Sequence, residues 1–191
     1  MTMRRLLVAI CLMCMAATTS LASIDAVDLG PASVSLDLSI GGSYSIKTGE
    51  ITELEHDYDK MTSAFQYSIY PATATYEGIS NQVTIEVHEM SQSRSLDEQI
   101  SGKRQISALE HCLEQSDMMP RRADYETESY TIDGHEGILA TIDTGGDNPL
   151  YIAGFSPDES NGSGSIVCFI GSDFPWETTK SIFESVSAKL A

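Results

Sequence analysis

The residues with the clearest chemical potential are four carboxylates spaced two positions apart. Glu53, Glu55, Asp57 and Asp59 lie in an acidic run. In an extended chain they share one face, because strand side chains alternate between faces. Clustered carboxylate oxygens are ligands that a hard cation such as calcium prefers. The run has neither the glycine turn nor the ligand order of an EF-hand, so we expect a solvated acidic segment and keep a calcium site as the alternative.

The histidines give no catalytic motif. They are His56, His88, His111 and His135. His88 lies in an alternating segment, where a hydrogen-bonded core or edge histidine is the ordinary interpretation. His111 and Cys112 are helix neighbours that point apart and cannot chelate one ion together. The sequence has no Gly-x-Ser-x-Gly, His-Glu-x-x-His or phosphate-loop pattern. We therefore assign no catalytic or cofactor-binding residue and favour a non-catalytic protein.

The chain begins with the pattern of an export signal, residues 1–22. Two arginines precede an uncharged apolar run over 6–17, and small residues follow up to Ala22. The run is shorter than the roughly 20 residues that span a bilayer, which favours cleavage near Ala22 over an uncleaved anchor. Lipid attachment at Cys14 is a weaker alternative, because methionine precedes it where a small residue is expected. We expect an extracytoplasmic protein, secreted or in the cell envelope.

After cleavage, Cys112 and Cys168 are the two cysteines left in a compartment that permits disulfides. A Cys112–Cys168 disulfide and two buried free thiols are both open, because sequence spacing does not fix the distance between their Cα atoms. Asn161 begins an Asn-Gly-Ser sequon in a Gly/Ser-rich loop. Glycosylation of Asn161 and an unoccupied sequon are likewise both open.

The composition excludes some partners. The 191 residues include 11 Lys+Arg against 28 Asp+Glu, which gives a net charge of -17. Nucleic-acid binding begins with Lys and Arg neutralising phosphates, so this charge argues against DNA and RNA. Anionic membrane surfaces are disfavoured for the same reason. The length suits a single domain.

Alternation of apolar and polar residues predicts strands along most of the mature chain. Turn residues separate them, and Asp133-Gly134 gives the clearest hairpin signal. One alternating segment is expected to stop at Pro71, because proline cannot donate a ladder hydrogen bond. The strands are expected over 34–38, 44–46, 65–69, 82–88, 125–132, 138–142, 150–155 and 165–170.

Helical spacing of apolar residues indicates two helices. One is expected over 95–116, and the other begins near Pro175 and continues to Leu190. A flexible lead-in is expected over 23–33. The fold class predicted for residues 34–191 is α+β: a single domain with a twisted antiparallel sheet flanked by two helices.

This order of elements resembles the PsbP-like fold. The resemblance rests on Tyr130–Gly137, Ser165–Ile170 and Phe174–Leu190, and with the first hairpins it covers most of residues 34–190. The pattern is also similar to that of exported proteins from methanogenic archaea. The resemblance implies an antiparallel sheet with flanking helices and a protein that binds partners rather than catalysing a reaction. No partner-contact residue of the family can be matched here.

The sequence therefore favours an exported, non-catalytic binding or interaction module. Phe174 and Trp176 are expected in the core or as a staple at the start of the last helix, and their alternative role is an exposed patch for an envelope or extracellular protein. The second hypothesis is an enzyme or solute-binding protein with an acidic, cation-assisted pocket. A structural role at the cell surface is the third.

Overall fold

Antiparallel strands account for most of the regular structure in this protein. The structure is a computed structural model, and it describes residues 24–57, 64–92, 109–110, 112–121, 123–157 and 164–191. The strands are β1 Asp25–Asp28, β2 Ala32–Leu36, β3 Tyr44–Thr48, β4 Thr52–Asp57, β5 Ala64–Tyr76, β6 Gln82–Gln92, β7 Tyr125–Ile132, β8 His135–Ile142, β9 Leu150–Phe155, β10 Gly164–Ser172 and β11 Ser187–Leu190. The helices are the 3₁₀ helix η1 Leu38–Gly41 and the α-helix α3 Trp176–Glu184, and residues 109–110 and 112–115 are also helical.

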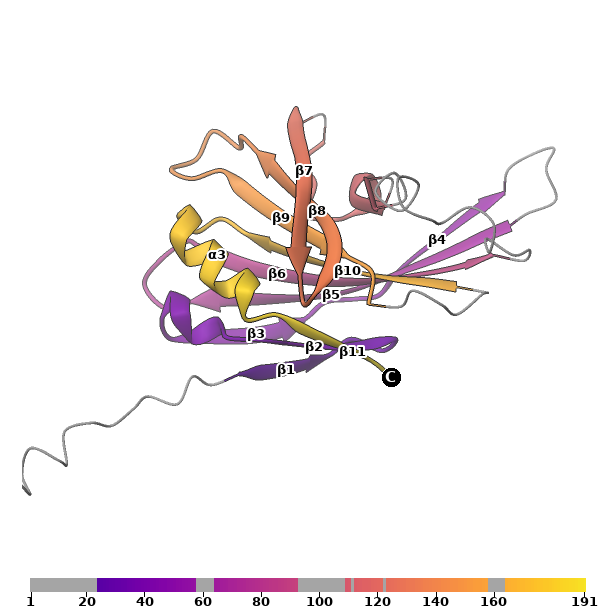
Figure 1. The fold of residues 1–191 in the computed structure, drawn as a ribbon, viewed down its shortest axis with the longest axis horizontal. Coiled ribbons are helices and arrows are strands. Elements are labelled where there is room, and N and C mark those ends of the chain that lie inside the picture. The colour runs from indigo at the N-terminus through magenta and orange to yellow at the C-terminus, as the bar shows by residue number, and fades with distance from the viewer. Residues whose placement is uncertain (1–23, 58–63, 93–108, 111, 122, 158–163) are drawn as a thin grey trace, which may run out of the picture.

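The strands form two sheets. In the described chain the larger sheet has eight strands, in the order β3-β5-β6-β10-β9-β8-β7, and β4 also pairs with β5. The smaller sheet has the order β1-β2-β11. All of the strand pairs are antiparallel, as the sequence predicts. The smaller sheet, η1 and α3 lie on one side of the larger sheet, and the helical residues near 112 lie on the other (Figure 1).

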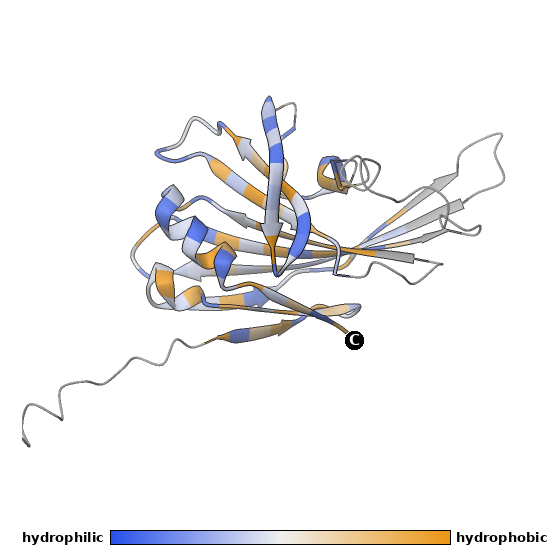
Figure 2. Ribbon diagram, in the orientation of Figure 1, coloured by the Kyte–Doolittle hydropathy of each residue, from blue (hydrophilic) through white to orange (hydrophobic). Residues whose placement is uncertain are grey.

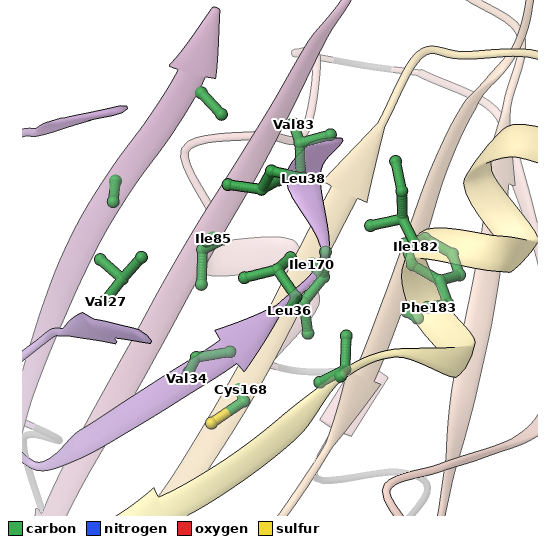
Figure 3. Close-up of a cluster of buried hydrophobic side chains, with 14 of the residues drawn as sticks. Val27, Val34, Leu36, Leu38, Val83, Ile85, Cys168, Ile170, Ile182 and Phe183 are labelled. Carbon is green, nitrogen blue, oxygen red and sulfur yellow. The ribbon is translucent and has the colours of Figure 1, made fainter. Parts of the chain in front are cut away.

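Both faces of the larger sheet are therefore covered, and each carries a hydrophobic core. Figure 2 shows apolar residues interspersed with polar ones along the strands. The core between the two sheets brings Leu36 of β2 against Ile85 of β6, Ile170 of β10 and Phe183 of α3 (Figure 3). The core on the opposite face includes Ile69, Met90, Leu109, Cys112, Leu113, Ile138, Ile142, Ile152, Val167 and Phe169.

Strand β5 does not stop at Pro71, contrary to the sequence-based prediction. It continues from Ala64 to Tyr76, with Pro71 opposite Glu86 of β6. The Pro71 carbonyl accepts a hydrogen bond from the Gly49 amide at 2.8 Å, which places its backbone polar groups on the edge away from β6. On that edge β4 pairs only as far as Ile69 and β3 begins at Ala72. The missing N–H therefore falls in the gap between two partner strands, where proline is tolerated.

The hairpin expected at Asp133-Gly134 joins β7 to β8. Both turn residues have positive φ, 51° at Asp133 and 79° at Gly134. A two-residue turn with positive φ at both positions matches the twist of the flanking strands. The Asp133 carboxylate also accepts a hydrogen bond from the Ala188 amide of β11 at 2.8 Å. The turn thus connects the hairpin to the smaller sheet.

The last helix is shorter than its apolar spacing predicts. α3 begins after Pro175 as expected, but it ends at Glu184, and Ser187–Leu190 forms β11 against β2. Leu190 was expected on the apolar side of this helix, but it is 39% exposed at the end of β11. The reason is non-local: β2 supplies backbone hydrogen-bonding partners for β11 that a pattern within the helix cannot reveal.

Two further expectations need correction. The lead-in over 23–33 is not entirely flexible, because residues 25–28 form β1 and Val27 is buried. The helix expected over 95–116 is described only from Leu109, where it is helical as far as 115, and the rest lies outside the described residues. The described fold is mostly antiparallel sheet with few helical residues, not clearly a sheet flanked by two helices. No helix in the described ranges is long and apolar enough to cross a membrane.

Candidate functional site

Strand β6 carries two charged or titratable residues into the interior. Its odd-numbered residues, such as Ile85, face the smaller sheet, as alternation predicts. Glu86 and His88 point to the other face, which an isolated strand would expose to solvent. Both are instead 0% exposed, because Leu109 and residues 112–121 pack over that face. Buried carboxylates of this kind require hydrogen-bonding partners.

Glu86 and His88 form a network with groups from neighbouring elements. The Glu86 Oε2 atom lies 2.7 Å from His88 Nε2 and accepts a hydrogen bond from Ser116 Oγ, also at 2.7 Å. On its other side, His88 Nδ1 hydrogen-bonds the hydroxyl of Tyr67 from β5. That hydroxyl also lies 3.3 Å from the carbonyl oxygen of Cys112. The network therefore links β5 and β6 to the segment that covers them.

The hydrogen count leaves two arrangements for this network. Tyr67 has one hydroxyl hydrogen, and the Cys112 carbonyl can only accept. Tyr67 therefore donates either to Cys112 or to His88 Nδ1, and in both arrangements His88 donates through Nε2 to the Glu86 carboxylate.

Burial keeps the neighbouring acids in their neutral forms. Desolvation raises the pKa of Tyr67 well above its ordinary value of 10.0, and nearby Cys112 and Glu86 raise it further. Desolvation also raises the pKa of Cys112 from 9.0 to about 12, against a smaller opposing effect of its hydrogen bond with Tyr67. The phenol and the thiol are therefore neutral near neutral pH.

The order Tyr67, His88, Glu86 has the form of a nucleophile, a base and an orienting carboxylate, but its setting does not suit catalysis. Tyr67 is 6% exposed and packs in the core with Ile69. An activated nucleophile needs a lowered pKa and access to substrate, whereas the pKa of this phenol is raised by burial. The chain of hydrogen bonds instead holds Glu86 in place.

A pocket of about 290 Å³ lies beside this network. We call it the Glu86 pocket; it is lined by Pro71, Thr73, Gln82, Thr84, Glu86, Asp117, Met118, Leu150 and Gly171. The strand register explains why these residues meet: Pro71 pairs with Glu86, and Thr84 is opposite both Thr73 and Gly171. Paired residues in a sheet present their side chains on the same face. Thr73, Thr84 and Glu86 thus project to one side of the sheet.

One oxygen of Glu86 is left without a partner in this setting. Oε2 has two, but the buried Oε1 has no hydrogen-bond partner among the described residues. Leaving a buried acceptor unsatisfied costs about 1–3 kcal/mol, more for a charged group. Most buried polar atoms are satisfied, and an exception calls for an explanation such as a binding role.

Residues 116–118 cover the network on the side away from the smaller sheet. Ser116 Oγ bonds to Glu86 and accepts a hydrogen bond from the Met118 amide at 3.1 Å. Met118 Sδ lies 2.5 Å from where a Cβ on Gly171 would stand, so a side chain at position 171 would require the Met118 side chain to shift. Asp117 is exposed, and its Oδ2 accepts a hydrogen bond from Thr52 of β4 at 3.3 Å. The segment thus brings a second carboxylate and a flexible thioether to the pocket.

Of the four acidic residues in the run, Glu53 has a described side chain, and it does not line the Glu86 pocket. Glu53 is exposed on β4. The side chains of Glu55 and Asp57 lie outside the described part of the chain, as does Asp59. Within the residues that are described, no group of three or more His, Cys, Asp or Glu could hold a metal ion. Calcium binding by the run stays a prediction.

Of the two alternatives left open for Cys112 and Cys168, the structure has no disulfide between them. Both cysteines are buried free thiols. Cys112 packs in the core near Met90, whereas Cys168 of β10 points to the opposite face of the sheet, into the core that contains Ile85. The sheet itself separates the two sulfur atoms. The alternative of two buried thiols is the one observed.

The remaining predicted residues have separate positions. Phe174 is 5% exposed and stacks edge-on against Tyr76, so it offers no surface to a partner. Trp176 is partly buried against Tyr151. His135 stacks on Phe155. The predicted signal segment 1–22, His111 and Asn161 lie outside the described residues, and the side chain of His56 does too.

None of the residues that line the Glu86 pocket was predicted as a site residue from the sequence. Thr84, Glu86 and His88 alternate with apolar residues, which is typical of an exposed strand face. Ser116 and Asp117 follow a helix in a polar segment with no motif. The available signal was a histidine and a glutamate two positions apart, which on a strand share a face. Only knowledge of the covering segment identifies that face as buried.

Comparisons with known proteins give no match. No family model matches the chain, and neither a curated protein nor a solved structure does so.

Proposed function

We propose that this protein is an exported, non-catalytic binding module whose ligand site is the Glu86 pocket. The observation that carries the proposal is the buried Oε1 of Glu86, which has no partner in the described chain and belongs to a residue that lines a pocket. The pocket volume of about 290 Å³ is at the lower end of ordinary ligand sites, which suits a small molecule. The ligand would supply the donor that Glu86 lacks.

The surroundings of the pocket support binding rather than reaction. Glu86 is fixed by His88 and Ser116 on one oxygen, so the other is held at a defined position on a rigid sheet. The Tyr67 phenol and the Cys112 thiol behind it are buried and neutral, because burial raises both of their pKa values. A preorganised acceptor without an accessible nucleophile suits recognition.

The pocket itself is tested by filling it. Thr84→Trp places a large side chain on the pocket floor, and Thr131→Trp makes the same change at an exposed position of β7. A library of small soluble compounds is screened by thermal melting, since a ligand that binds the native state raises the midpoint. We expect compounds that stabilise the unmodified protein and Thr131→Trp but not Thr84→Trp. Compounds that stabilise both variants equally would contradict the proposal. So would a screen in which no compound stabilises the unmodified protein or either variant.

We propose as part of the same function that the protein is exported. We also propose that it has the PsbP-like fold, with two helices flanking the sheet. They are supported by the pattern of residues 1–22 and by the antiparallel order of the larger sheet. N-terminal sequencing of protein purified from the medium or envelope of native cells tests export: a start near Ser23 is expected, and a start at Met1 inside the cells would contradict it. A partner surface at Phe174 and Trp176 has less support, because Phe174 is buried.

A further inference from the structure

The chemistry of the Glu86 pocket restricts its ligand to one class. This inference rests on the proposed function and asks which molecule the pocket suits. The first observation is that Glu86 Oε1 has no hydrogen-bond partner among the described residues, although Glu86 is 0% exposed. An ionised carboxylate oxygen only accepts hydrogen bonds, so its missing partner is a donor. Hydrogen bonds between a charged donor and a carboxylate are about twice as strong as neutral ones.

The second element is the sign of the charge around the pocket. Asp117 adds another carboxylate to the lining. None of the lining residues in the described chain is Lys, Arg or His, and the whole protein carries a net charge of -17. Such surroundings favour a cation and disfavour an anion. His88, the one histidine in contact with Glu86, binds the opposite oxygen and does not line the pocket.

The third element is the apolar part of the lining. Pro71, Leu150 and Met118 contribute carbon and sulfur surface beside the two carboxylates. Thr73, Thr84 and Gln82 add polar groups that can contact a short polar substituent. A ligand with a charged donor at one end and a short apolar body satisfies both parts. A bare ion satisfies only the carboxylates.

We infer that the Glu86 pocket binds a small organic ammonium ion, with its nitrogen donating to Glu86 Oε1 and its alkyl portion against Pro71, Leu150 and Met118. Because Oε1 has almost no accessible surface, a side chain of the lining has to move aside for the nitrogen to reach it, and we assign this movement to Met118. Methionine has three rotatable side-chain bonds and accommodates such movement readily. Asp117, at the exposed edge, attracts the cation without contacting the buried end.

The test is a calorimetric and NMR titration of the purified protein with four probes: n-butylammonium, n-butanol, butyrate and calcium chloride. The first three share a short alkyl chain and differ in charge. We expect n-butylammonium to bind most tightly. Glu86→Gln should weaken it about 30-fold or more, because a buried charged partner is lost. Glu89→Gln is the matched control, since Glu89 lies on the same strand, points to the opposite face and contacts Tyr70.

A second variant keeps the test valid if Glu86→Gln folds poorly. Asp117→Asn changes an exposed residue of the pocket and should weaken n-butylammonium up to about fivefold. Binding of n-butanol, butyrate or calcium as tight as that of n-butylammonium would overturn the ammonium assignment while the pocket proposal stands. No binding of any probe would also overturn it, and the Thr84→Trp comparison would then decide the pocket separately.

Discussion

Strand β6 presents two different surfaces to the interior of the same molecule. Toward the smaller sheet it buries Val83, Ile85 and Val87, and toward Leu109 and residues 112–121 it carries Thr84, Glu86 and His88. The apolar face gains stability from burial alone. The other face buries polar groups whose hydrogen bonds stabilise the folded state only slightly more than their hydrogen bonds to water did. Such a group destabilises the fold when it has no partner. The first face thus stabilises the fold through apolar burial, whereas the second buries a carboxylate oxygen that has no partner among the described residues, at the position where we propose a ligand binds.

The largest expected effect comes from removing the centre of the polar face. Glu86→Leu leaves His88 and Ser116 without their shared acceptor, so we expect a loss of about 3–5 kcal/mol in the free energy of unfolding. Urea denaturation measures it. Glu89→Leu, the same change on the opposite face, should cost less than about 1 kcal/mol. Equal effects at the two positions would remove the distinction between the faces.

A combined replacement sharpens the same comparison. Glu86→Leu with His88→Leu and Ser116→Ala removes the donors together with the acceptor. Replacement of a buried polar group by apolar residues of similar size is often neutral or stabilising. We therefore expect this triple variant to recover most of the stability lost in Glu86→Leu but not its ligand binding. A triple variant no more stable than the single one would show that the network stabilises the fold.

On the apolar face, Ile85→Ala should cost about 2–4 kcal/mol. Ile85 is 0% exposed and packs between β6 and the smaller sheet, so truncation leaves a cavity. Ile79→Ala, at a turn residue that is 47% exposed, provides the control and should change stability by less than about 0.5 kcal/mol. Chemical denaturation of both variants measures the difference. A change below about 1 kcal/mol at Ile85 would mean that this face is not a packed core.

Each face also contains one buried thiol, and the two should respond alike to alkaline pH. Burial raises the pKa of Cys112 and of Cys168 from 9.0 to about 12. Well below pH 9 the thiols are protonated in both the folded and the unfolded protein, so their burial costs no stability. As pH rises from 9 toward 12, the unfolded thiols ionise and the folded ones do not, so stability falls. Each thiol contributes a slope of about 1 kcal/mol per pH unit.

Denaturation at increasing pH, in the unmodified protein and in Cys112→Ala and Cys168→Ala, measures this slope. Each single replacement should reduce it by a similar amount. A slope that one replacement leaves unchanged would indicate that the thiol concerned is accessible to water in the folded protein.

The smallest predicted effect concerns the hairpin that joins β7 to β8. Gly134 has a φ of 79°, a conformation that disfavours side chains, so Gly134→Ala should cost about 1 kcal/mol. Gly146→Ala in the following loop is the control, because its added Cβ would meet only ordinary contacts. The melting temperatures of the two variants measure the difference. Equal melting temperatures would indicate that the turn adapts to alanine.

Local patterns predicted the strands and turns well where neighbouring residues determine them. The Asp133-Gly134 turn and the alternation in β6 are of this kind. Pro71 and residues 187–190 were predicted incorrectly, because a gap between β3 and β4 accommodates the proline and β2 recruits β11. Both depend on partners distant in sequence.

The candidate site could not be predicted from local sequence patterns, because it also depends on contacts between residues distant in sequence. Glu86 alternates with buried residues and so resembles a solvated position until Leu109 and residues 112–121 cover it. The hydrogen bond from Ser116 to Glu86 joins positions 30 apart in the chain. No spacing rule predicts that contact, and the unpaired Oε1 becomes visible only once the partners of Oε2 are known.

A crystal structure of the protein soaked with n-butylammonium tests whether Glu86 Oε1 binds an organic ammonium ion. We expect the nitrogen at about 2.7–2.9 Å from Glu86 Oε1, with the alkyl chain against Leu150 and the Met118 side chain displaced. A Glu86 Oε1 already bonded to a group of the protein, or an ammonium ion bound only elsewhere, would contradict it.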